Sequence, residues 1–338
     1  DVYKQKLKPT EDFIAFSAFV CFFPQLVAGP IERATNLLPQ FYKKRTFEYN
    51  KVVDGMRQIL WGLFKKVVIA DNCAEYANLI FNNYHDYNGS TLLLGAIFFT
   101  FQIYGDFSGY SDIAIGTSRL FGFNLMQNFA TPYFSRDIAE FWRRWHMSLS
   151  TWFRDYLYIP LGGSRGGAWM KVRNTFIIFL ASGFWHGANW TFVAWGALNA
   201  IYFLPLQLKR RNRVNIDIIG ATRALPSITE LFQMGLTFFL TVIAWIIFRS
   251  PTINDSIIYI SKIFIPAVEQ DYISIDIKVI LTAFFFIIIE WLGRKGLYGI
   301  EFLKTHKLRK IFYLIIGLFI FWQFFSHSAN NDFIYFQF

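Results

Sequence analysis

The chain has 338 residues, of which 54% are hydrophobic, 20% aromatic and only 17% charged. Soluble domains carry roughly a quarter charged residues, so this composition argues against a soluble globular protein and predicts a surface that faces lipid. The net charge of +10 does not indicate a nucleic-acid partner, because no basic fold motif is present and the basic residues cluster in loops beside apolar runs. Apolar segments recur throughout, so we predict a single polytopic membrane domain over residues 1–338, of all-α class.

The first two segments are interrupted or too polar to be simple spans. Residues 13–31 are apolar but contain Pro24, Gly29 and Pro30, and because proline breaks helices we predict a span that ends in a turn. Residues 52–81 follow a helical pattern, yet their charged side chains make the helix too polar to face lipid all round. We therefore expect an interfacial or protein-lined helix there.

A third apolar run, 92–104, is predicted to begin a span that leads into the polar segment 105–112. Asp106 and Asp112 would then lie at the end of this span, where they would either line a polar tunnel or cap a helix at the membrane surface. Asp112 and Arg119 are two helical turns apart, which brings a direct ion pair between them within reach.

Residues 133–158 interleave aromatic with charged side chains. Asp137 followed by Glu140 resembles the box that begins a helix, and a helix of this kind lies in the membrane interface or against a polar interior rather than spanning. At helical spacing the residues that share a face with His146 are Trp142, Leu149, Ser150 and Phe153, whereas Arg143, Arg144 and Arg154 lie elsewhere. His146 is therefore expected to point into the protein, as a packed structural side chain or, if it meets His186 in the fold, as a functional one.

The second half of the chain is divided by a glycine-rich loop. Residues 160–167 lack the Lys-Ser/Thr ending and the preceding strand of a phosphate-binding loop, so we predict a flexible basic turn. Residues 175–208 contain no Asp, Glu, Lys or Arg and suit two short helices with a break between Gly183 and Gly187. Further spans are predicted at 231–248, 279–291 and 311–325.

The loops between these spans predict the orientation of the chain. Loops 207–229 and 293–310 are basic, whereas 250–276 is acidic. By the positive-inside rule the first two should be cytoplasmic and the third external. The C-terminal Phe338 is then expected to be extracytoplasmic.

His186 is the only side chain of 175–208 that titrates near neutral pH. An ionisable group at membrane depth is costly and marks a functional site by default. Gly183 and Gly187 permit a backbone break and a close approach of substrate to the ring, while Trp185 and Trp190 are placed to wall off a dry pocket and Asn189 offers a polar partner. The structural alternative is a neutral histidine that is hydrogen-bonded between helices.

The remaining candidates for chemistry are weak. His85, His306 and His327 fall in polar or terminal segments and are expected to be solvated. The sequence has no HExxH or CxxC motif and no GxSxG nucleophile elbow, and Cys21 and Cys73 have no ligand spacing. We expect no metal site and no bound cofactor.

Several long sequence runs resemble the membrane-bound O-acyltransferase (MBOAT) family. The runs are 23–33 (FPQLVAGPIER), 106–112 (DFSGYSD), 132–137 (PYFSRD), 141–156 (FWRRWHMSLSTWFRDY), 184–190 (FWHGANW) and 333–338 (FIYFQF). Within the family the chain is most similar to the bacterial alginate O-acetylation branch, close to the membrane protein of teichoic-acid D-alanylation. Members carry further N-terminal spans, so we expect that earlier spans precede Asp1.

The resemblance implies a helical bundle, with broken and interfacial helices, around a central tunnel. It implies His186 as the catalytic residue and His146 as the second family histidine. It also implies that the donor is acetyl-CoA or a similar acyl thioester from the cytoplasm, with a polysaccharide acceptor, an extracytoplasmic acetyltransferase partner and residence in the bacterial inner membrane. The residues expected to bind substrate are Asn189, Trp185, Asp112 and Ser150.

Acyl transfer from a thioester to an alcohol needs a base for the hydroxyl and stabilisation of the developing oxyanion. Neutral His186 suits the base, because apolar surroundings disfavour the imidazolium, and His146 or Asn189 would orient the acceptor or the thioester carbonyl. Two alternatives remain open at this level. One is a transporter of an acyl group or lipid, against which the lack of an internal inverted repeat counts, and the other is a non-catalytic scaffold for an extracellular enzyme.

Overall fold

The computed structural model describes residues 1–221, 223–265 and 273–326, and no β-strand occurs within these ranges. The predicted all-α class is confirmed. The helices and short helical turns, in chain order, are α1 (Phe13–Val20), η1 (Phe23–Gln25), α2 (Ala34–Phe41), α3 (Tyr49–Leu63), η2 (Phe64–Ala70), α4 (Asp71–Asn82), α5 (Gly89–Leu120), η3 (Pro132–Phe134), α6 (Ile138–Arg144), α7 (Met147–Phe153), η4 (Arg154–Tyr158), α8 (Ala168–His186), α9 (Trp190–Leu208), α10 (Ile228–Arg249), α11 (Ile253–Ile263), α12 (Ile277–Gly293) and α13 (His306–Ser326).

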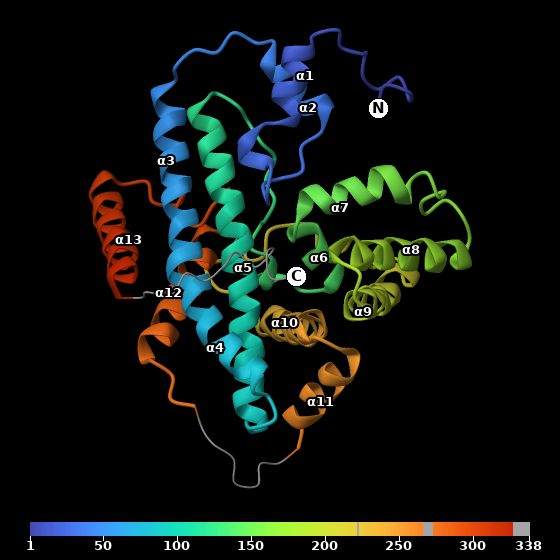
Figure 1. The fold of residues 1–338 in the computed structure, drawn as a ribbon, viewed down its shortest axis with the longest axis vertical. Coiled ribbons are helices and arrows are strands. Elements are labelled where there is room, and N and C mark those ends of the chain that lie inside the picture. The colour runs from blue at the N-terminus through green and yellow to red at the C-terminus, as the bar shows by residue number, and fades with distance from the viewer. Residues whose placement is uncertain (222, 266–272, 327–338) are drawn as a thin grey trace.

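Helix α5 is the long central helix of the molecule (Figure 1). It begins where Asn88 accepts a hydrogen bond from the Thr91 main-chain N–H (2.9 Å) and runs for 32 residues, which is about 48 Å at the rise of an α-helix. The prediction that a span begins near residue 92 is confirmed. The prediction that it ends near Asp106 and Asp112 is wrong, because the polar segment stays helical and is covered by protein.

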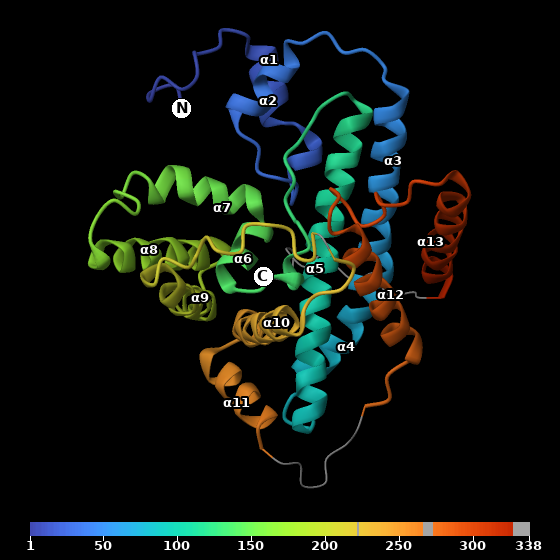
Figure 2. The same ribbon diagram turned by 180° about the vertical axis from the view of Figure 1, so that it is seen from behind.

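A second rod lies beside α5 along most of its length. Helix α3, the π-helical segment η2 and α4 follow one another without a break and pack against α5 (Figures 1 and 2). The predicted helix at 52–81 is therefore confirmed. It was expected to be interfacial or protein-lined, and the structure shows it lined by protein along α5.

Two pairs of glycines let the rods approach closely. A Cβ on Gly62 would lie 2.6 Å from the carbonyl oxygen of Gly109, and one on Gly109 would lie 2.8 Å from that of Gly62. Gly55 and Gly116 form the same reciprocal contact, at 2.7 and 2.5 Å. Small residues at such positions allow main chains to pack directly against each other in membranes.

Charged side chains are paired inside the same interface. The Lys65 Nζ lies 2.5 Å from Asp112 Oδ2, with both side chains buried, and Gln58 Nε2 donates to Asp112 Oδ1 (2.7 Å). Lys66 Nζ lies 2.8 Å from Asp106 Oδ1. Both carboxylates lie within α5 and pair with lysines of the neighbouring rod, so the predicted alternative of capping a helix end is wrong. Asp112 also lines a small pocket together with Lys65 and Glu290, and the tunnel alternative stays a prediction.

Arg119 and Glu290 make further polar contacts in this bundle. The predicted Asp112–Arg119 pair does not form, since Arg119 reaches Asp54 instead (2.6 Å). Glu290 on α12 accepts hydrogen bonds from Trp61 Nε1 (3.1 Å) and from the Tyr104 hydroxyl (2.5 Å). This carboxylate therefore ties α12 to both rods.

The N-terminal apolar segment does not form the predicted span. Helix α1 has only eight residues, followed by the three-residue turn η1 that contains Pro24. Eight residues rise about 12 Å, whereas a bilayer core is about 30 Å thick. The turn-forming residues of 13–31 thus end the helix earlier than the apolar composition suggested.

The other predicted spans coincide with helices. Segments 231–248, 279–291 and 311–325 fall within α10, α12 and α13, and 160–167 is an irregular turn as predicted. Helix α11 was not predicted, because it lies in the acidic segment 250–276. Phe338 and residues 333–338 lie outside the described residues.

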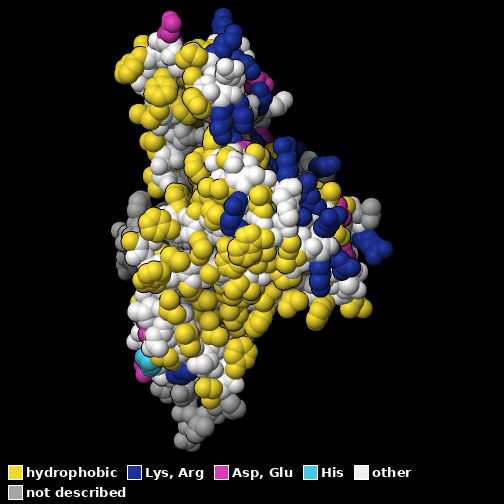
Figure 3. All heavy atoms as spheres, turned by 90° about the vertical axis from the view of Figure 1, so that its right-hand side faces the viewer, with side chains coloured by type: hydrophobic (Ala, Val, Ile, Leu, Met, Phe, Trp, Pro, Cys, Tyr) yellow, Lys and Arg dark blue, Asp and Glu magenta, His cyan; other side chains and the backbone are white. Residues whose placement is uncertain are grey.

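A lipid-facing surface follows from the same helices. Within the described ranges, α5, α9 and α10 are long and apolar enough to cross a membrane. Phe184, Ile201 and Phe232, on α8, α9 and α10, are each more than half exposed. The face formed by α7 to α9 carries a broad field of hydrophobic side chains, with Lys and Arg gathered along one side of it (Figure 3).

We predict that Gly109→Val lowers the free energy of unfolding by about 1–3 kcal/mol, the usual cost of overpacking, because the new side chain collides with the Gly62 carbonyl. Thermal unfolding in detergent measures the effect. Gly235→Val is the matched control, since a Cβ at Gly235 of α10 meets nothing within 4 Å. Equal melting temperatures for the two variants would contradict the predicted close packing.

We also predict that Lys65→Met lowers the free energy of unfolding by about 3–5 kcal/mol, because it leaves the Asp112 carboxylate buried without its cation. Lys51→Met, which removes a half-exposed partner of Glu48, should cost at most about 1 kcal/mol. The double variant Lys65→Met/Asp112→Leu should recover most of the loss, since it buries no unpaired charge. Failure of the double variant to recover would show that the ion pair is not the source of the effect.

Candidate active site

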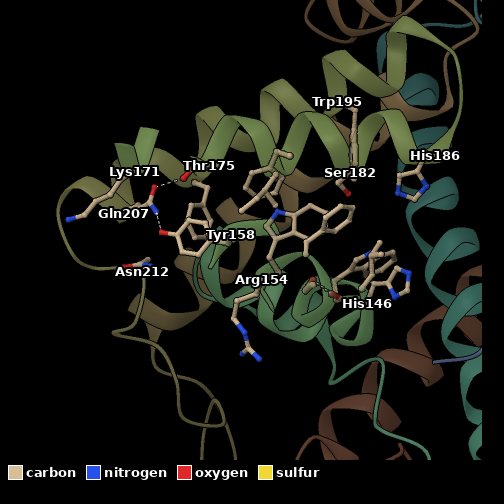
Figure 4. A pocket seen from close by; sticks show the side chains of 18 of the residues that line it. His146, Arg154, Tyr158, Lys171, Thr175, Ser182, His186, Trp195, Gln207 and Asn212 are labelled. Atoms are coloured by element: carbon tan, nitrogen blue, oxygen red, sulfur yellow. Dashed lines mark hydrogen bonds between the residues drawn. The ribbon is translucent and has the colours of Figure 1, made fainter. Parts of the chain in front are cut away.

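A cavity of about 480 Å³ lies between the α6–α7 segment and the α8–α9 hairpin, closed by α5 and α10. Figure 4 shows its two ends: Lys171, Gln207 and Asn212 lie at one, and His146 and His186 lie at the other. Aromatic side chains line the space between, among them Trp142, Phe153, Phe179, Trp195, Phe203 and Trp245. The fold therefore brings together the two histidines that the sequence singled out.

Aromatic rings surround both imidazoles. The His146 side chain is 4% exposed, and its ring centroid is 4.6 Å from that of Phe107. The His186 ring lies 5.4 Å from Trp195 and 5.1 Å from Phe248. The condition under which His146 was expected to be functional, that it meets His186 in the fold, is satisfied.

A break between two short helices positions His146. Asp137 begins α6 by accepting from the Glu140 main-chain N–H (2.7 Å), which is one half of the predicted box; the Glu140 side chain accepts from the Arg136 main-chain N–H (2.8 Å) and not from that of Asp137. The predicted single helix over 133–158 is wrong, however, because His146 adopts a left-handed conformation (φ 44°, ψ 54°) and separates α6 from α7. Left-handed backbone is strained for a residue other than glycine and persists only where its surroundings hold it.

Main-chain hydrogen bonds supply that restraint. Met147 N–H donates to the Asn128 carbonyl (2.9 Å), and Ala130 N–H donates to the Arg144 carbonyl (3.0 Å). The side chain of Asn128 also contacts the His146 ring, with Oδ1 3.1 Å from Nδ1. Asn128 is a residue that sequence reasoning missed, since no local pattern joins it to a histidine in another segment.

The face predicted for His146 is partly correct. Trp142, Leu149, Ser150 and Phe153 all line the cavity with it. Arg154 was expected to point elsewhere but lines the cavity too, because α7 passes into the wider π-helical turn η4 just before this residue.

The hairpin of α8 and α9 positions His186 as the last residue of α8. The predicted break lies at Gly187–Asn189, with Gly187 at φ 154°. A Cβ on Gly183 would collide with the Phe192 carbonyl, and one on Gly196 would collide with that of Phe179. Gly183 thus admits the main chain of α9, not a substrate as was expected.

The four residues expected to bind substrate lie in different places. Ser150 lines the cavity. The Trp185 ring lies 5.1 Å from His186 and 6.4 Å from His146, but half of this residue is exposed. Asn189 is exposed and caps α9 through Thr191 N–H (3.0 Å), while its Nδ2 donates to the Pro251 carbonyl (3.0 Å). Asp112 lies away from the cavity in its pair with Lys65.

The other end of the cavity is basic. Of the described residues that line it, four carry a cationic side chain and none carries a carboxylate; the four are Arg154, Lys171, Arg210 and Arg213. Beside them Thr175 Oγ1 donates to Gln207 Oε1 (2.5 Å), and Gln207 Nε2 donates to the Tyr158 hydroxyl (3.1 Å). The sequence analysis used the basic residues of loop 207–229 only to predict the orientation of the chain, and it did not predict that they line a cavity.

One carboxylate lies just outside this basic end. The hydrogen bond from Arg154, with Arg33 beside it, lowers the pKa of the Asp155 carboxyl. Asp155 therefore stays anionic and is shared between two guanidinium groups. Elsewhere in the described part of the chain, no three His, Cys, Asp or Glu residues come together as metal ligands would.

Comparison with known proteins defines the class. The model of the membrane-bound O-acyltransferase family, MBOAT, matches residues 3–247. The chain belongs to this family and is a multi-pass membrane protein.

Individual relatives carry three related names. The chain is 44% identical to the probable alginate O-acetylase AlgI of Pseudomonas aeruginosa, over 75% of this chain and 46% of that protein. It is 38% identical to the peptidoglycan O-acetyltransferase of Helicobacter pylori, over 72% and 45%, and 30% identical to the teichoic acid D-alanyltransferase of Streptococcus thermophilus, over 71% and 62%. The chain spans about half the length of the first of these relatives.

Proposed function

We propose that this chain forms the catalytic core of a membrane O-acyltransferase, which moves an acetyl group from a thioester donor to the hydroxyls of an extracytoplasmic polysaccharide. The observation that carries the proposal is the single cavity that joins a cationic end to a pair of histidines. A transporter of acyl groups has no need of two imidazoles at the aromatic end of such a cavity.

The cationic end suits a donor with phosphate groups. Acetyl-CoA carries phosphates at one end and the reactive thioester at the other, and guanidinium groups bind phosphate well. A cavity of about 480 Å³ lies within the usual range of ligand sites, roughly 300–1,000 Å³. The aromatic walls between the ends accommodate the uncharged arm of the donor.

The orientation predicted from the loop charges supports entry of the donor from the cytoplasm. Arg210 and Arg213 belong to the basic loop 207–229, which the positive-inside rule assigns to the cytoplasm. The same loop lines the cationic end of the cavity. A cytoplasmic thioester would then enter among these arginines and present its acyl group to the histidines.

The chemistry at the histidine end is a direct transfer. His186 accepts the proton of the acceptor hydroxyl, and the oxygen attacks the thioester carbonyl. A C–O bond forms, the C–S bond breaks, and the thiolate leaves with the proton that His186 returns. A general base positioned in this way contributes about 10²–10⁴-fold in rate.

The relatives' names support the acceptor class. They refer to alginate, peptidoglycan and teichoic acid, which are polymers with free hydroxyls. We therefore propose a cell-surface polysaccharide as the final acceptor, a partner acetyltransferase on the extracytoplasmic side, and location in the bacterial inner membrane.

We predict that His186→Ala inserts into membranes normally but transfers acetyl groups at least about 100-fold more slowly, because it removes the base. Transfer of label from radioactive acetyl-CoA to polysaccharide in isolated membranes measures the rate. His85→Ala, at an exposed loop outside the cavity, is the matched control. Wild-type transfer by His186→Ala would remove the assignment, and uptake of acetyl groups without covalent transfer by the wild type would favour a transporter.

We predict that the double variant Lys171→Gln/Arg213→Gln raises the KM for acetyl-CoA about tenfold, equivalent to roughly 1.4 kcal/mol, with a smaller change in kcat. The physical reason is the loss of two cations that contact donor phosphates, and the effect of added salt on KM should weaken as well. Lys209→Gln, an exposed neighbour that does not line the cavity, should leave KM unchanged. An equal rise in KM for the control would count against a phosphate site.

A further inference from the structure

Asn128 is fully buried, in the segment that follows α5, and its side chain joins α5 to the turn that carries His146. Its Nδ2 donates to the Ser111 hydroxyl on α5 (3.1 Å). Its Oδ1 lies 3.1 Å from His146 Nδ1, 2.8 Å from Ser148 Oγ and 3.3 Å from the Ser148 main-chain nitrogen. One amide oxygen thus gathers three contacts from the turn that carries the histidine.

The main-chain contact determines which atom of the amide faces the turn. A main-chain N–H can only donate, so the amide atom that Ser148 N–H meets must be the oxygen. The same oxygen faces His146 Nδ1, and a carbonyl oxygen can only accept. The Nδ1 of His146 therefore carries the proton, and in the neutral ring Nε2 carries a lone pair.

We propose that Asn128 is a positioning residue that holds His146 in its Nδ1–H form, so that Nε2 can only accept a hydrogen bond at the histidine end of the cavity. This inference rests on the proposed function and gives the two histidines different roles: His186 is the base, and His146 is a hydrogen-bond acceptor. The reacting hydroxyl gives its single proton to His186, so a His146 ring that only accepts binds a neighbouring hydroxyl of the polysaccharide by that group's proton. It does not donate to the thioester carbonyl, whose oxygen needs a donor.

The main chain of Asn128 has a separate role. Its carbonyl accepts from Met147 N–H (2.9 Å) and so holds the left-handed turn at His146. Substitution of the side chain leaves this main-chain bond in place. Asn128→Leu therefore tests the amide group apart from the path of the backbone.

The protonated nitrogen is observed directly by 15N NMR of the full-length protein labelled at histidine, in detergent, with the His146 signals assigned by their loss in His146→Gln. The expected wild-type result is a protonated Nδ1 and an unprotonated Nε2. Asn128→Asp should keep this pattern, because a carboxylate still accepts from Nδ1, whereas Asn128→Leu should shift protonation toward Nε2.

Acyl transfer provides the second measurement. Asn128→Leu should lower kcat about 10–100-fold with little change in the KM for acetyl-CoA, since the donor phosphates are bound at the other end. Asn128→Asp should restore most of the rate near neutral pH. Its carboxylate raises the pKa of His146, so the acid limb of its pH–rate profile should move to higher pH.

Asn199→Leu is the matched control. Asn199 is equally buried and donates to the Trp195 carbonyl (2.9 Å), but it does not line the cavity. Its substitution should leave the His146 signals as in the wild type. A change in those signals equal to that of Asn128→Leu would make the effect one of general destabilisation and would overturn the proposal.

The remaining outcomes separate this inference from the proposed function. A wild-type spectrum with the proton on Nε2 would overturn the role of Asn128 without any variant. If the spectra respond to Asn128 as expected but the wild type transfers no acyl group, the proposed function fails and the positioning of His146 stands.

Discussion

The pairing of buried charges along α5 is the constraint on which the rest of the structure depends. Hydrocarbon offers no partner to a charged or polar group, so each such group must find one within the protein. Asp106 and Asp112 find theirs in Lys66 and Lys65 of the neighbouring rod, and the glycine contacts bring the two main chains close enough for these short reaches. Breaking one partner leaves a buried charge, so the rods have one register in which all of the pairs form.

Helix α5 also contributes directly to the candidate site. Helix α5 contributes Ile103 and Phe107 to the cavity wall, and its Ser111 receives the hydrogen bond of Asn128. The histidine turn is thus connected to the paired rods through one buried amide. Interruptions of regular helix gather at the same place, at His146 and at Gly187. Irregular backbone at membrane depth is tolerated where it is buried in protein or lines a cavity, and here the breaks aim the two imidazoles at one space.

The two ends of the cavity differ in the way a transfer reaction across a membrane requires. Under the proposed function, the cations lie where the charged donor binds, and the histidines lie where its acyl group reacts. Aromatic side chains line the space between them and surround the imidazoles with apolar groups, which favours their neutral, basic form. This gradient, more than any single residue, distinguishes the cavity from a simple packing defect.

Much of the fold and part of the site could be predicted from the sequence, because those features depend on local order along the chain. Apolar runs and helix-breaking residues located most of the helices and the break after His186, and the lone histidine of an uncharged stretch lines the cavity. Asp137 before Glu140 predicted the start of α6.

What the sequence could not reveal depends on contacts between distant segments. Asp112 pairs with Lys65 of another rod, and Arg154 lines the cavity because η4 widens the helix turn. The left-handed turn at His146 exists because Asn128 and Ala130 hold it. Such partners are chosen by packing in three dimensions, where free energy depends on which groups meet and not on their spacing in the chain.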